Sequence, residues 1–191
     1  PNLQQLPRVA SGDDMSGDIT KGCIKQLFVP PFPDWVLLEA DYSQIELRVA
    51  GLLSQDAAFL SAYRNHEDLH ALTASAAYGV PLCDVTPEQR TSAKAINFGI
   101  IYLMGPGTLA ETLGIGEDEA ALIISNTMDK YAGYAEWVER TKAEVRKRGY
   151  VESLFGHRRH LPEAKSRNRF ESERALRQAC NHPVQSTASN M

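Results

Sequence analysis

Apolar residues follow a helical spacing through most of the chain beyond residue 42. Ile45, Val49 and Leu52 lie three to four positions apart, which places them on one face of a helix. Patterns of this kind predict helices near 43–54, 56–63, 67–78, 87–103, 107–113, 117–130 and 134–148. A hairpin or irregular stretch is expected after Gly149, followed by a last helix over about 170–179.

Two short apolar runs nearer the start of the chain predict strands instead. They are CIKQLFV at 23–29 and WVLLEAD at 35–41, and the segment PPFPD makes a turn between them. Residues 8–22 are rich in Gly, Ser and Asp and are expected to form a loop. A few strands combined with many helices predict a helix-dominated α+β fold.

The helix expected over 87–103 has a well-marked start. Thr86 is a suitable N-cap, Pro87 suits the first helical position, and Gln89 completes a capping box with Thr86. The positive end of the helix dipole lies at this first turn. It adds to the positive potential of any cation placed there.

Four residues with binding chemistry follow at steps of four on this helix, and so share one face: Arg90, Lys94, Phe98 and Tyr102. The two cations repel each other by roughly a few tenths of a kcal/mol, so helix stability does not favour the pair. A polyanion bound along the face would attract both cations and make their proximity favourable. The aromatic rings offer a flat surface on which a base can lie. The pattern therefore predicts a nucleotide site, and the solvated edge of an ordinary amphipathic helix is the alternative.

The apolar run at 35–41 ends in Asp41, directly before the helix expected from 43. A carboxylate at the end of a buried strand is a common metal ligand, and its oxygens suit Mg²⁺, which also binds substrate phosphates. The alternative is that Asp41 only helps to cap the helix. Ser43 and Glu46 fit a second capping box, so Glu46 could serve that purpose alone.

Composition excludes several other classes of protein. With 43% hydrophobic residues, 191 residues can bury a sizeable core in one or two domains. No apolar run approaches 18 residues and no signal peptide is visible, so no membrane association is expected. Three scattered cysteines predict reduced thiols, and the absence of a GxxxxGK[ST] loop argues against a P-loop hydrolase.

Two of these segments, DYSQIELR at 41–48 and RTSAKAINFGIIY at 90–102, resemble motifs of the family A DNA polymerases. The first resembles the strand-to-helix motif of the palm and the second the nucleotide-binding helix of the fingers. PNLQQLP, DLHALTASAAYG, GYVESLFGHRRHLPE and ERALRQACNHPVQSTAS resemble further family segments in the same order. The resemblance implies a right-hand polymerase fold: palm over 1–79, an inserted helical fingers subdomain over 80–170, and a return to the palm over 171–191.

The resemblance also implies a function, which is template-directed addition of deoxynucleotides to a primer by two-metal phosphoryl transfer. Asp41 would bind two Mg²⁺ ions, with the backbone carbonyl of Tyr42 as a further ligand. Lys94 would donate a proton to pyrophosphate and Arg90 would stabilise charge on the triphosphate. The nucleotide-binding residues would be His70, Arg90, Lys94, Phe98, Tyr102, Glu46 and Gln44. Among these, Glu46 would lie under the sugar and exclude a 2′-hydroxyl.

Primer–template DNA and deoxynucleoside triphosphates are the partners that the resemblance implies. The residues expected to contact DNA are Asn2, Gln4, Arg177, Asn181 and Gln185. Minor-groove acceptors occur in every base pair, so such contacts would test geometry without demanding a sequence. A polar turn around Pro183 is the alternative for Asn181 and Gln185, and a helix histidine with satisfied hydrogen bonds is the alternative for His70.

Charge supports a polyanionic partner only in one region. The net charge is −4, but residues 141–180 hold eleven Lys/Arg and five Asp/Glu, a balance of +6 that leaves −10 elsewhere. Such segregation is typical of one face that contacts a polyanion. The better DNA candidates are Arg158, Arg159, Arg174 and Arg177. The residues of 142–148 are instead expected to form a solvated face of a helix.

Two departures from the family pattern bear on these expectations. Leu103 stands where the family usually has Gly, which affects the end of the nucleotide-binding helix. The His-Asp-Glu motif, with the second metal-binding carboxylate, does not occur in residues 1–191. We therefore expect the isolated piece to be catalytically inert and weakly stable. The parent protein is expected to be a monomer in the cytoplasm of a bacterium or of a virus-infected cell, and an organelle is the alternative location. A non-catalytic nucleotide- or DNA-binding module is the alternative function.

Overall fold

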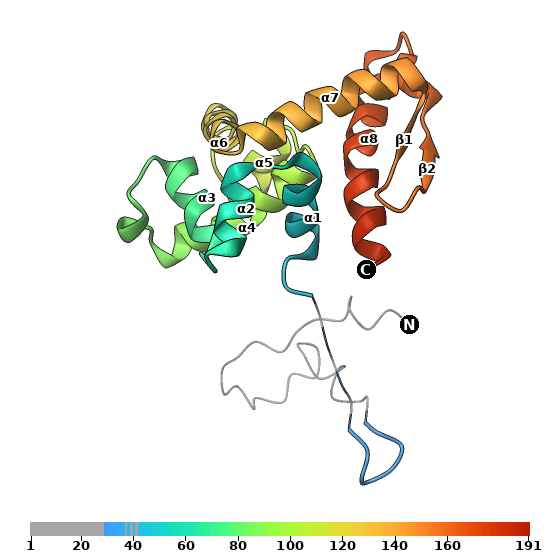
Figure 1. The fold of residues 1–191 in the computed structure, drawn as a ribbon. Coiled ribbons are helices and arrows are strands. Elements are labelled where there is room, and N and C mark those ends of the chain that lie inside the picture. The colour runs from blue at the N-terminus through green and yellow to red at the C-terminus, as the bar shows by residue number, and fades with distance from the viewer. Residues whose placement is uncertain (1–28, 37, 39, 41) are drawn as a thin grey trace. The chain divides into compact units, whose positions relative to one another are not determined.

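The structure, a computed structural model, describes residues 29–36, 38, 40 and 42–191. The chain divides into two compact units, Pro1–Tyr42 and Ser43–Met191. Every helix and strand that the described residues form belongs to the second unit (Figure 1).

The second unit consists of helices, a two-stranded hairpin and a long last helix. In chain order its elements are α1 (Ile45–Ser54), α2 (Ala57–Arg64), α3 (Leu69–Tyr78), the short 3-10 turn η3 (Leu82–Asp84), α4 (Pro87–Ile101), α5 (Pro106–Leu113), α6 (Glu117–Lys130), α7 (Ala132–Arg148), β1 (Tyr150–Glu152), β2 (Arg158–His160), the 3-10 turn η4 (Pro162–Lys165) and α8 (Arg169–Ser189).

The helix-dominated class predicted from the sequence is confirmed. All seven helices expected between 43 and 148 are present, with ends that differ from the predicted ones by a few residues. The hairpin expected after Gly149 is also present, because β1 and β2 pair antiparallel with Val151 opposite Arg159. None of the described helices is long and apolar enough to cross a membrane.

The strand predicted over 35–41 is not formed by the residues of that segment that the structure describes, which are 35, 36, 38 and 40. The expected turn before it is present, since the backbone N–H of Trp35 donates to the Phe32 carbonyl at 3.1 Å. A strand needs the backbone of a neighbour to satisfy its N–H and C=O groups. The described residues of this unit supply no such neighbour. The strand predicted at 23–29 lies outside the described residues except for Val29.

The start of α1 differs from the predicted capping box. The N-cap is Gln44 rather than Ser43, and no side chain caps the helix there. Gln44 has a left-handed backbone, with φ of 55°. Its neighbour Glu46 is engaged by another helix instead of by its own first turn, as described below.

The last helix is much longer than the predicted 170–179, and the alternative of a polar turn around Pro183 is wrong. α8 runs through Pro183 to Ser189. An internal proline removes one helical hydrogen bond and costs about 3 kcal/mol in an isolated helix. Here Pro183, Val184 and Thr187 are buried, so burial of the second half of α8 offsets that cost.

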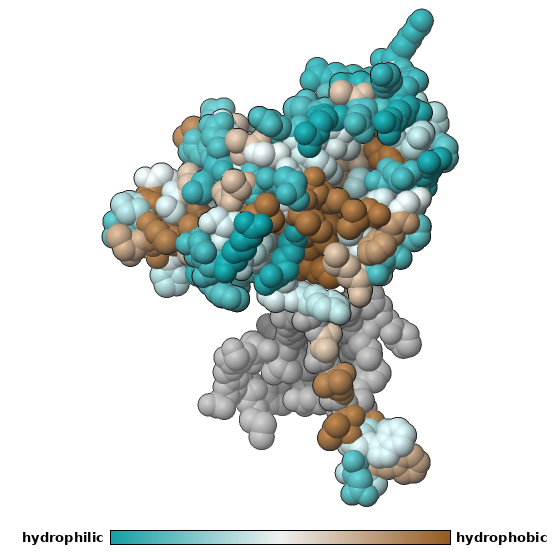
Figure 2. Space-filling view, in the orientation of Figure 1, coloured by the Kyte–Doolittle hydropathy of each residue, from teal (hydrophilic) through white to brown (hydrophobic). Residues whose placement is uncertain are grey.

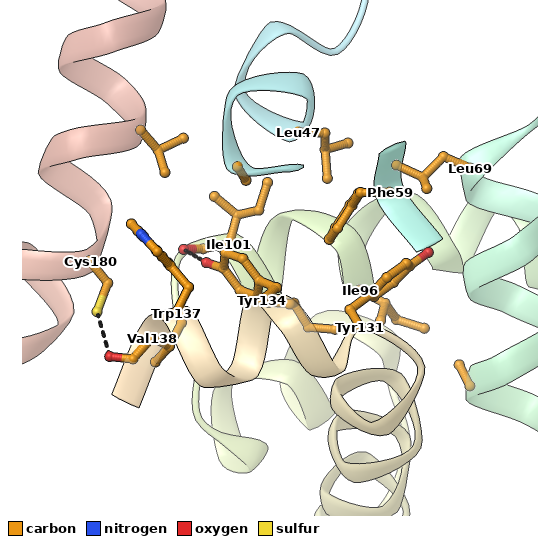
Figure 3. Packing of buried hydrophobic residues seen from close by; sticks show 14 of the residues in the cluster. Leu47, Phe59, Leu69, Ile96, Ile101, Tyr131, Tyr134, Trp137, Val138 and Cys180 are labelled. Atoms are coloured by element: carbon orange, nitrogen blue, oxygen red, sulfur yellow. Dashed lines mark hydrogen bonds between the residues drawn. The ribbon is translucent and has the colours of Figure 1, made fainter. Parts of the chain in front are cut away.

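All eight α-helices that the described residues form contribute buried residues to the main core, and its centre is aromatic (Figure 3). The Phe59 ring stacks on Tyr131 at a centroid distance of 4.2 Å. The Tyr134 hydroxyl donates to the Ile101 carbonyl at 3.1 Å, which satisfies the only polar atom of that fully buried side chain. These contacts hold the last turn of α4 against α7.

A buried carboxylate joins the starts of α2 and α7. Asp56 accepts from the backbone N–H of Phe59 at 2.9 Å and from that of Tyr134 at 3.1 Å. Gly133 permits this close approach, because a Cβ atom there would lie 2.9 Å from the Cα of Asp56. Any larger residue at 133 would push the two helix ends apart.

A second, smaller core lies beneath the hairpin. It consists of Val145, Val151, Leu161, Ala164, Ala175, Leu176 and Ala179, which join α7, the hairpin, η4 and α8. The hairpin therefore runs beside α8 (Figure 1). The surface over the start of α8 is mostly hydrophilic, whereas apolar residues gather on the surface over α1 (Figure 2), where Leu52 is exposed.

Candidate functional site

The predicted start of α4 is confirmed in full. The Gln89 backbone N–H donates to the Thr86 hydroxyl at 3.2 Å, and the Thr86 N–H donates to the Gln89 side-chain oxygen at 3.0 Å. Pro87 occupies the first helical position. The capping box sets the phase of α4 and hence which of its side chains face outward.

That phase leaves the predicted binding face open. Arg90, Lys94 and Phe98 are exposed, and Tyr102 is half-buried at the C-cap. The Phe98 and Tyr102 rings are nearly parallel, at 10° and a centroid distance of 6.5 Å. The face thus offers two cations followed by two aligned rings, which is the order of a phosphate tail followed by a base.

Arg90 is held in place by the N-cap residue of α3. Its Nε donates to Asp68 Oδ2, while Asp68 Oδ1 accepts from the backbone N–H groups of His70 and Ala71. Burial works to raise the pKa of Asp68, but the bonds from Arg90 and from the α3 backbone outweigh it, so that pKa lies below its usual value. No described hydrogen bond engages the two terminal nitrogens of Arg90, which leaves them available to an anion.

Glu46 and Tyr102 meet across the junction of α1 and α4. The Tyr102 hydroxyl donates to Glu46 Oε2 at 2.6 Å. Burial raises the pKa of Tyr102, the bond to Glu46 raises it further, and a hydrogen bond with Gln185 of α8 opposes this. Three residues predicted separately, two for the nucleotide and one for DNA, therefore lie together.

His70 lies in a buried chain of polar side chains rather than on the surface. It is 7% exposed. The Asn97 side-chain nitrogen lies 2.9 Å from its Nδ1, and the Gln44 amide lies 2.9 Å from its Nε2. The other end of the Gln44 amide accepts from the Tyr63 hydroxyl at 3.2 Å. Both ring nitrogens thus face protein amides, and the helix histidine with satisfied hydrogen bonds stays the alternative for His70.

The chain continues into the core behind His70. Asn97 is 1% exposed, and its oxygen accepts from the Thr73 hydroxyl at 2.8 Å. Thr73 lies 2.7 Å from the Tyr131 hydroxyl. The Asn97 oxygen faces Thr73 and the Gln44 oxygen faces Tyr63, so each amide turns its donor nitrogen toward the ring, and the neutral ring can accept at only one of its two nitrogens. Burial lowers the pKa of His70, Asp68 opposes this, and Arg90 and Lys94 lower it further, so the ring is neutral near pH 7.

Gln44 links this chain to the surface. A left-handed backbone costs a non-glycine residue about 1 kcal/mol, and such strain is concentrated at functional sites. The strained residue also lines a small cleft of about 200 Å³, together with Arg48, Tyr63 and Asp68. The Arg48 guanidinium lies 4.4 Å from the centre of the Tyr63 ring.

The predicted DNA contacts of α8 share one face of that helix. Arg177 and Gln185 are exposed and Asn181 is half-buried. The Asn181 Oδ1 atom is buried without a hydrogen-bond partner, and it is the one such side-chain atom among the described residues. An unsatisfied buried acceptor of this kind costs about 1–3 kcal/mol unless a ligand or water meets it.

Several predicted residues cannot be placed relative to this site. Asn2, Gln4 and Asp41 lie outside the described residues. Tyr42 is exposed and belongs to the first unit. Among the described residues no three His, Cys, Asp or Glu side chains are close enough together to hold a metal ion. Two described carboxylates beside α4, those of Glu46 and Asp68, already accept hydrogen bonds from Tyr102 and Arg90.

Sequence reasoning missed three residues that the structure brings to this site: Asp68, Thr73 and Asn97. Each had a weak signal. Asp68 precedes a helical pattern, which marks an N-cap, while Thr73 and Asn97 are polar residues at positions that the helical period turns inward. None of these signals identifies a partner, because the partners lie more than twenty residues away in sequence.

Comparisons with known proteins agree with this geometry. The DNA polymerase A family, described as "DNA polymerase family A", matches residues 1–191. DNA polymerase I of Pseudomonas aeruginosa is 44% identical over 192 residues, which cover 100% of this chain and 20% of the relative. The thermostable DNA polymerase I of Thermus filiformis is 41% identical over 100% of this chain and 22% of the relative. The chain thus spans about a fifth of the length of these curated relatives.

A solved structure is also similar. It is the "POL domain of Pol1 from M. smegmatis complex with DNA primer-template and dNTP", with a TM-score of 0.73 and 39% identity over 78% of this chain and 26% of that one. That protein was therefore observed with both a primer–template and a nucleotide. The matches cover this whole chain, and they agree with the two cations and two rings on the exposed face of α4. The chain therefore belongs to DNA polymerase family A.

Proposed function

We propose that the parent protein is a template-directed DNA polymerase and that this chain supplies its nucleotide-binding helix and part of its DNA contact. The observation that carries the proposal is the exposed face of α4, where Arg90, Lys94 and Phe98 follow one another at helical spacing. The division into palm over 1–79, fingers over 80–170 and a return to the palm over 171–191 belongs to this proposal. So do a monomeric state and a cytoplasmic location.

The triphosphate lies along the first turns of α4 in this proposal. The free terminal nitrogens of Arg90 and the exposed Lys94 ammonium bind its oxygens, with Lys94 also protonating the pyrophosphate as it leaves. Asp68 keeps the Arg90 guanidinium oriented before the nucleotide arrives. Orientation before binding lowers the entropy cost of forming the complex.

The base and sugar lie over the end of α4. The exposed Phe98 ring and the Tyr102 ring beside it bound the base, and Glu46 stands under the sugar, where a full-length carboxylate excludes a 2′-hydroxyl. The hydrogen bond from Tyr102 fixes the Glu46 side chain in that position. Support for this arrangement comes from the three side chains meeting at one end of α4.

His70 acts in the same site. Its ring lies between the Asn97 amide at Nδ1 and the Gln44 amide at Nε2, and Gln44 is the strained residue that links it to the surface. In this conformation His70 reaches a nucleotide through Gln44, and direct contact of His70 with the triphosphate requires Gln44 to move aside.

DNA lies against the exposed stripe of α8 in the proposal, with Arg177, Asn181 and Gln185 facing the duplex, and Asn2 and Gln4 adding contacts from the first unit. The unpartnered Asn181 oxygen supports this assignment, because a base-edge donor would satisfy it. Gln185 lies near enough to lower the pKa of Tyr102, which would let the DNA face sense the base pocket.

Metal binding is part of the proposal through Asp41, which lies outside the described residues, and Tyr42. Asp41 and the Tyr42 carbonyl are oxygen ligands of the kind that Mg²⁺ prefers. Two bound Mg²⁺ ions would activate the primer 3′-hydroxyl and neutralise the leaving pyrophosphate.

Single-nucleotide primer extension by the parent protein with Mg²⁺ tests the function. We expect templated incorporation that is abolished by Asp41→Ala and reduced at least a hundredfold by Lys94→Ala, which removes a charge from the transition state. Lys142→Ala is the matched control, because Lys142 is a lysine of α7 that pairs with Glu139. No incorporation by the wild-type protein, with DNA binding intact, would instead identify a non-catalytic DNA-binding module.

A further inference from the structure

A surface cleft of about 380 Å³ lies between the hairpin and the first half of α8, away from the nucleotide face. Its walls include Arg159 and His160 of β2, and Phe170, Arg174 and Gln178 of α8. A volume of this order is at the lower end of the range of small-ligand sites. We propose that this cleft binds an unpaired nucleotide of the template strand ahead of the primer–template duplex, with its base stacked on Phe170 and its phosphates on Arg159 and Arg174. The inference rests on the proposed function and deepens it.

The first argument concerns Phe170. It is 72% exposed, although it stands at the start of a helix whose apolar residues are otherwise turned into the core. An exposed aromatic ring beside cations is the usual platform for a base of single-stranded nucleic acid, because every base has a π-face. A core role would not leave the ring in water.

The second argument concerns the arginines. Two exposed arginines near the cleft are already neutralised, since Arg158 pairs with Glu152 and Arg169 with Glu173. Within the described part of the chain, neither Arg159 nor Arg174 forms an ion pair. Both guanidinium groups that line the cleft are therefore available to a phosphate.

Two carboxylates also line the cleft, and they fit the same ligand. Glu171 accepts from the Ser166 hydroxyl at 2.8 Å, which fixes its position. Glu163 has no hydrogen-bond partner among the described residues. A carboxylate beside a stacked base can accept from an exocyclic amine, whereas it would repel a ligand that was only a phosphate. The mixed lining therefore favours a nucleotide over a free anion.

The third argument is the position of the cleft on α8. Phe170, Arg174 and Gln178 lie at steps of four, and Asn181 and Gln185 continue the same stripe. The buried residues of α8 lie on the opposite side. From Asn181 to Arg174 the helix rises about 10 Å, which is about three nucleotides of a strand. A template that leaves a duplex at Asn181 would reach Phe170 after about three to five unpaired nucleotides.

The test is the affinity of the parent protein for two matched primer–templates, one with a template overhang of one nucleotide and one with eight. We expect the wild-type protein to bind the long overhang more tightly. In Phe170→Ala the ratio of the affinities for the long and the short overhang should fall by about tenfold. The affinity for the short overhang should stay unchanged. Arg174→Gln should also weaken only the long overhang, and lower the slope of log affinity against log salt by about 0.7.

Matched controls separate this site from general effects. Phe170→Tyr keeps the ring and should bind as wild type. Phe155→Ala removes an exposed ring from the hairpin turn, and Arg169→Gln removes an arginine already paired with Glu173; both should leave the overhang preference intact. The Phe170 ring is exposed, so the melting temperature of Phe170→Ala should not change.

An unchanged overhang preference in Phe170→Ala and Arg174→Gln would overturn the inference. Equal losses for both overhangs would also overturn it, because they would place the two residues on the duplex. These outcomes differ from a failure of the proposed function, in which the wild-type protein would not extend the primer on either template.

Discussion

The Tyr102 hydroxyl donates a hydrogen bond of 2.6 Å to Glu46 Oε2, which ties the end of α4 to the first turn of α1 across 56 residues of sequence. A double-mutant cycle with Tyr102→Phe and Glu46→Ala should show a coupling free energy of about 1 kcal/mol, because the acceptor is charged but the pair is partly solvated. Urea titration of the chain measures it. The exposed Lys142–Glu139 pair is the control, with an expected coupling of about 0.3 kcal/mol. Additive effects of the Tyr102 and Glu46 changes would contradict the prediction.

Selectivity for the sugar should depend on the length of the side chain at position 46. In the parent protein, Glu46→Ala should raise kcat/KM for ribonucleotides relative to deoxynucleotides by about tenfold or more, because it opens space under the sugar. Glu46→Gln keeps the length and should remain near wild type in this ratio. Steady-state insertion of matched ribo- and deoxynucleotides measures it. An equal loss for both sugars in Glu46→Ala would assign Glu46 a structural role only.

Asn97 should be the most sensitive member of the buried polar chain. Asn97→Ala leaves His70 Nδ1 without its partner, whereas the Thr73 hydroxyl keeps the Leu69 carbonyl and the Tyr131 hydroxyl, so it should lower the free energy of unfolding by about 2 kcal/mol. Asn126→Ala is the matched control, because Asn126 makes one long bond of 3.4 Å to the Ala77 carbonyl. It should cost about 0.5 kcal/mol. Similar losses in the two variants, measured by urea titration, would contradict the network.

The residue after α4 carries a backbone strain that can be measured. Leu103 has φ of 51°, and it closes the helix because the Leu103 N–H donates to Ile100 and the Met104 N–H to Gly99. This is the bonding pattern that usually places glycine at the first residue beyond the cap. Leu103→Ala and Leu103→Gly lose the same packing, but only alanine keeps the strain, so the glycine variant should be more stable by about 1 kcal/mol. The reverse order in thermal melts would show that the strain is absent.

Alkaline pH should destabilise the fold through its buried tyrosines. Burial raises the pKa of Tyr131 to about 12, and burial also raises the pKa values of Tyr63 and Tyr134 above their usual range. The folded state holds these protons more tightly than the unfolded state, whose tyrosines titrate near pH 10. The resulting stability is complete below about pH 10 and is lost as the pH rises toward the folded values.

Urea titrations between pH 8 and pH 11.5 measure this loss. Each of these tyrosines should contribute a slope of about 1.4 kcal/mol per pH unit between its two pKa values. Tyr131→Phe should flatten the fall by one such contribution. A slope that is the same in Tyr131→Phe and in the wild type would contradict the assignment.

Local features of the chain were predictable because their causes lie within a few residues. The α4 capping box joins Thr86 to Gln89, and the phase that it sets brings Arg90, Lys94 and Phe98 to one exposed face. The hairpin after Gly149 follows from a glycine with positive φ at the end of α7. Such signals need no knowledge of the rest of the fold.

Other features depended on partners that sequence distance hides. The capping box that Ser43 and Glu46 offered as an alternative is not formed, because Tyr102 binds Glu46, and His70 lies between Gln44 and Asn97, which come from other segments of the chain. α8 continues through Pro183 because the buried half beyond it packs against α1 and α7. A strand was expected at 35–41 from its apolar composition, yet strand formation also requires a neighbouring backbone.

The amino-acid sequence by itself determined the helical periods, the start of α4 and the two-cation, two-ring face, because capping and helical phase arise from bonds between residues three or four apart. Only the tertiary structure decided which polar groups are satisfied by protein and which face water. It paired Arg158 and Arg169 but left Arg159 and Arg174 unpaired beside an exposed Phe170. The physical reason is that burial and ion pairing depend on which helices meet, and that is settled by the packing of the whole core.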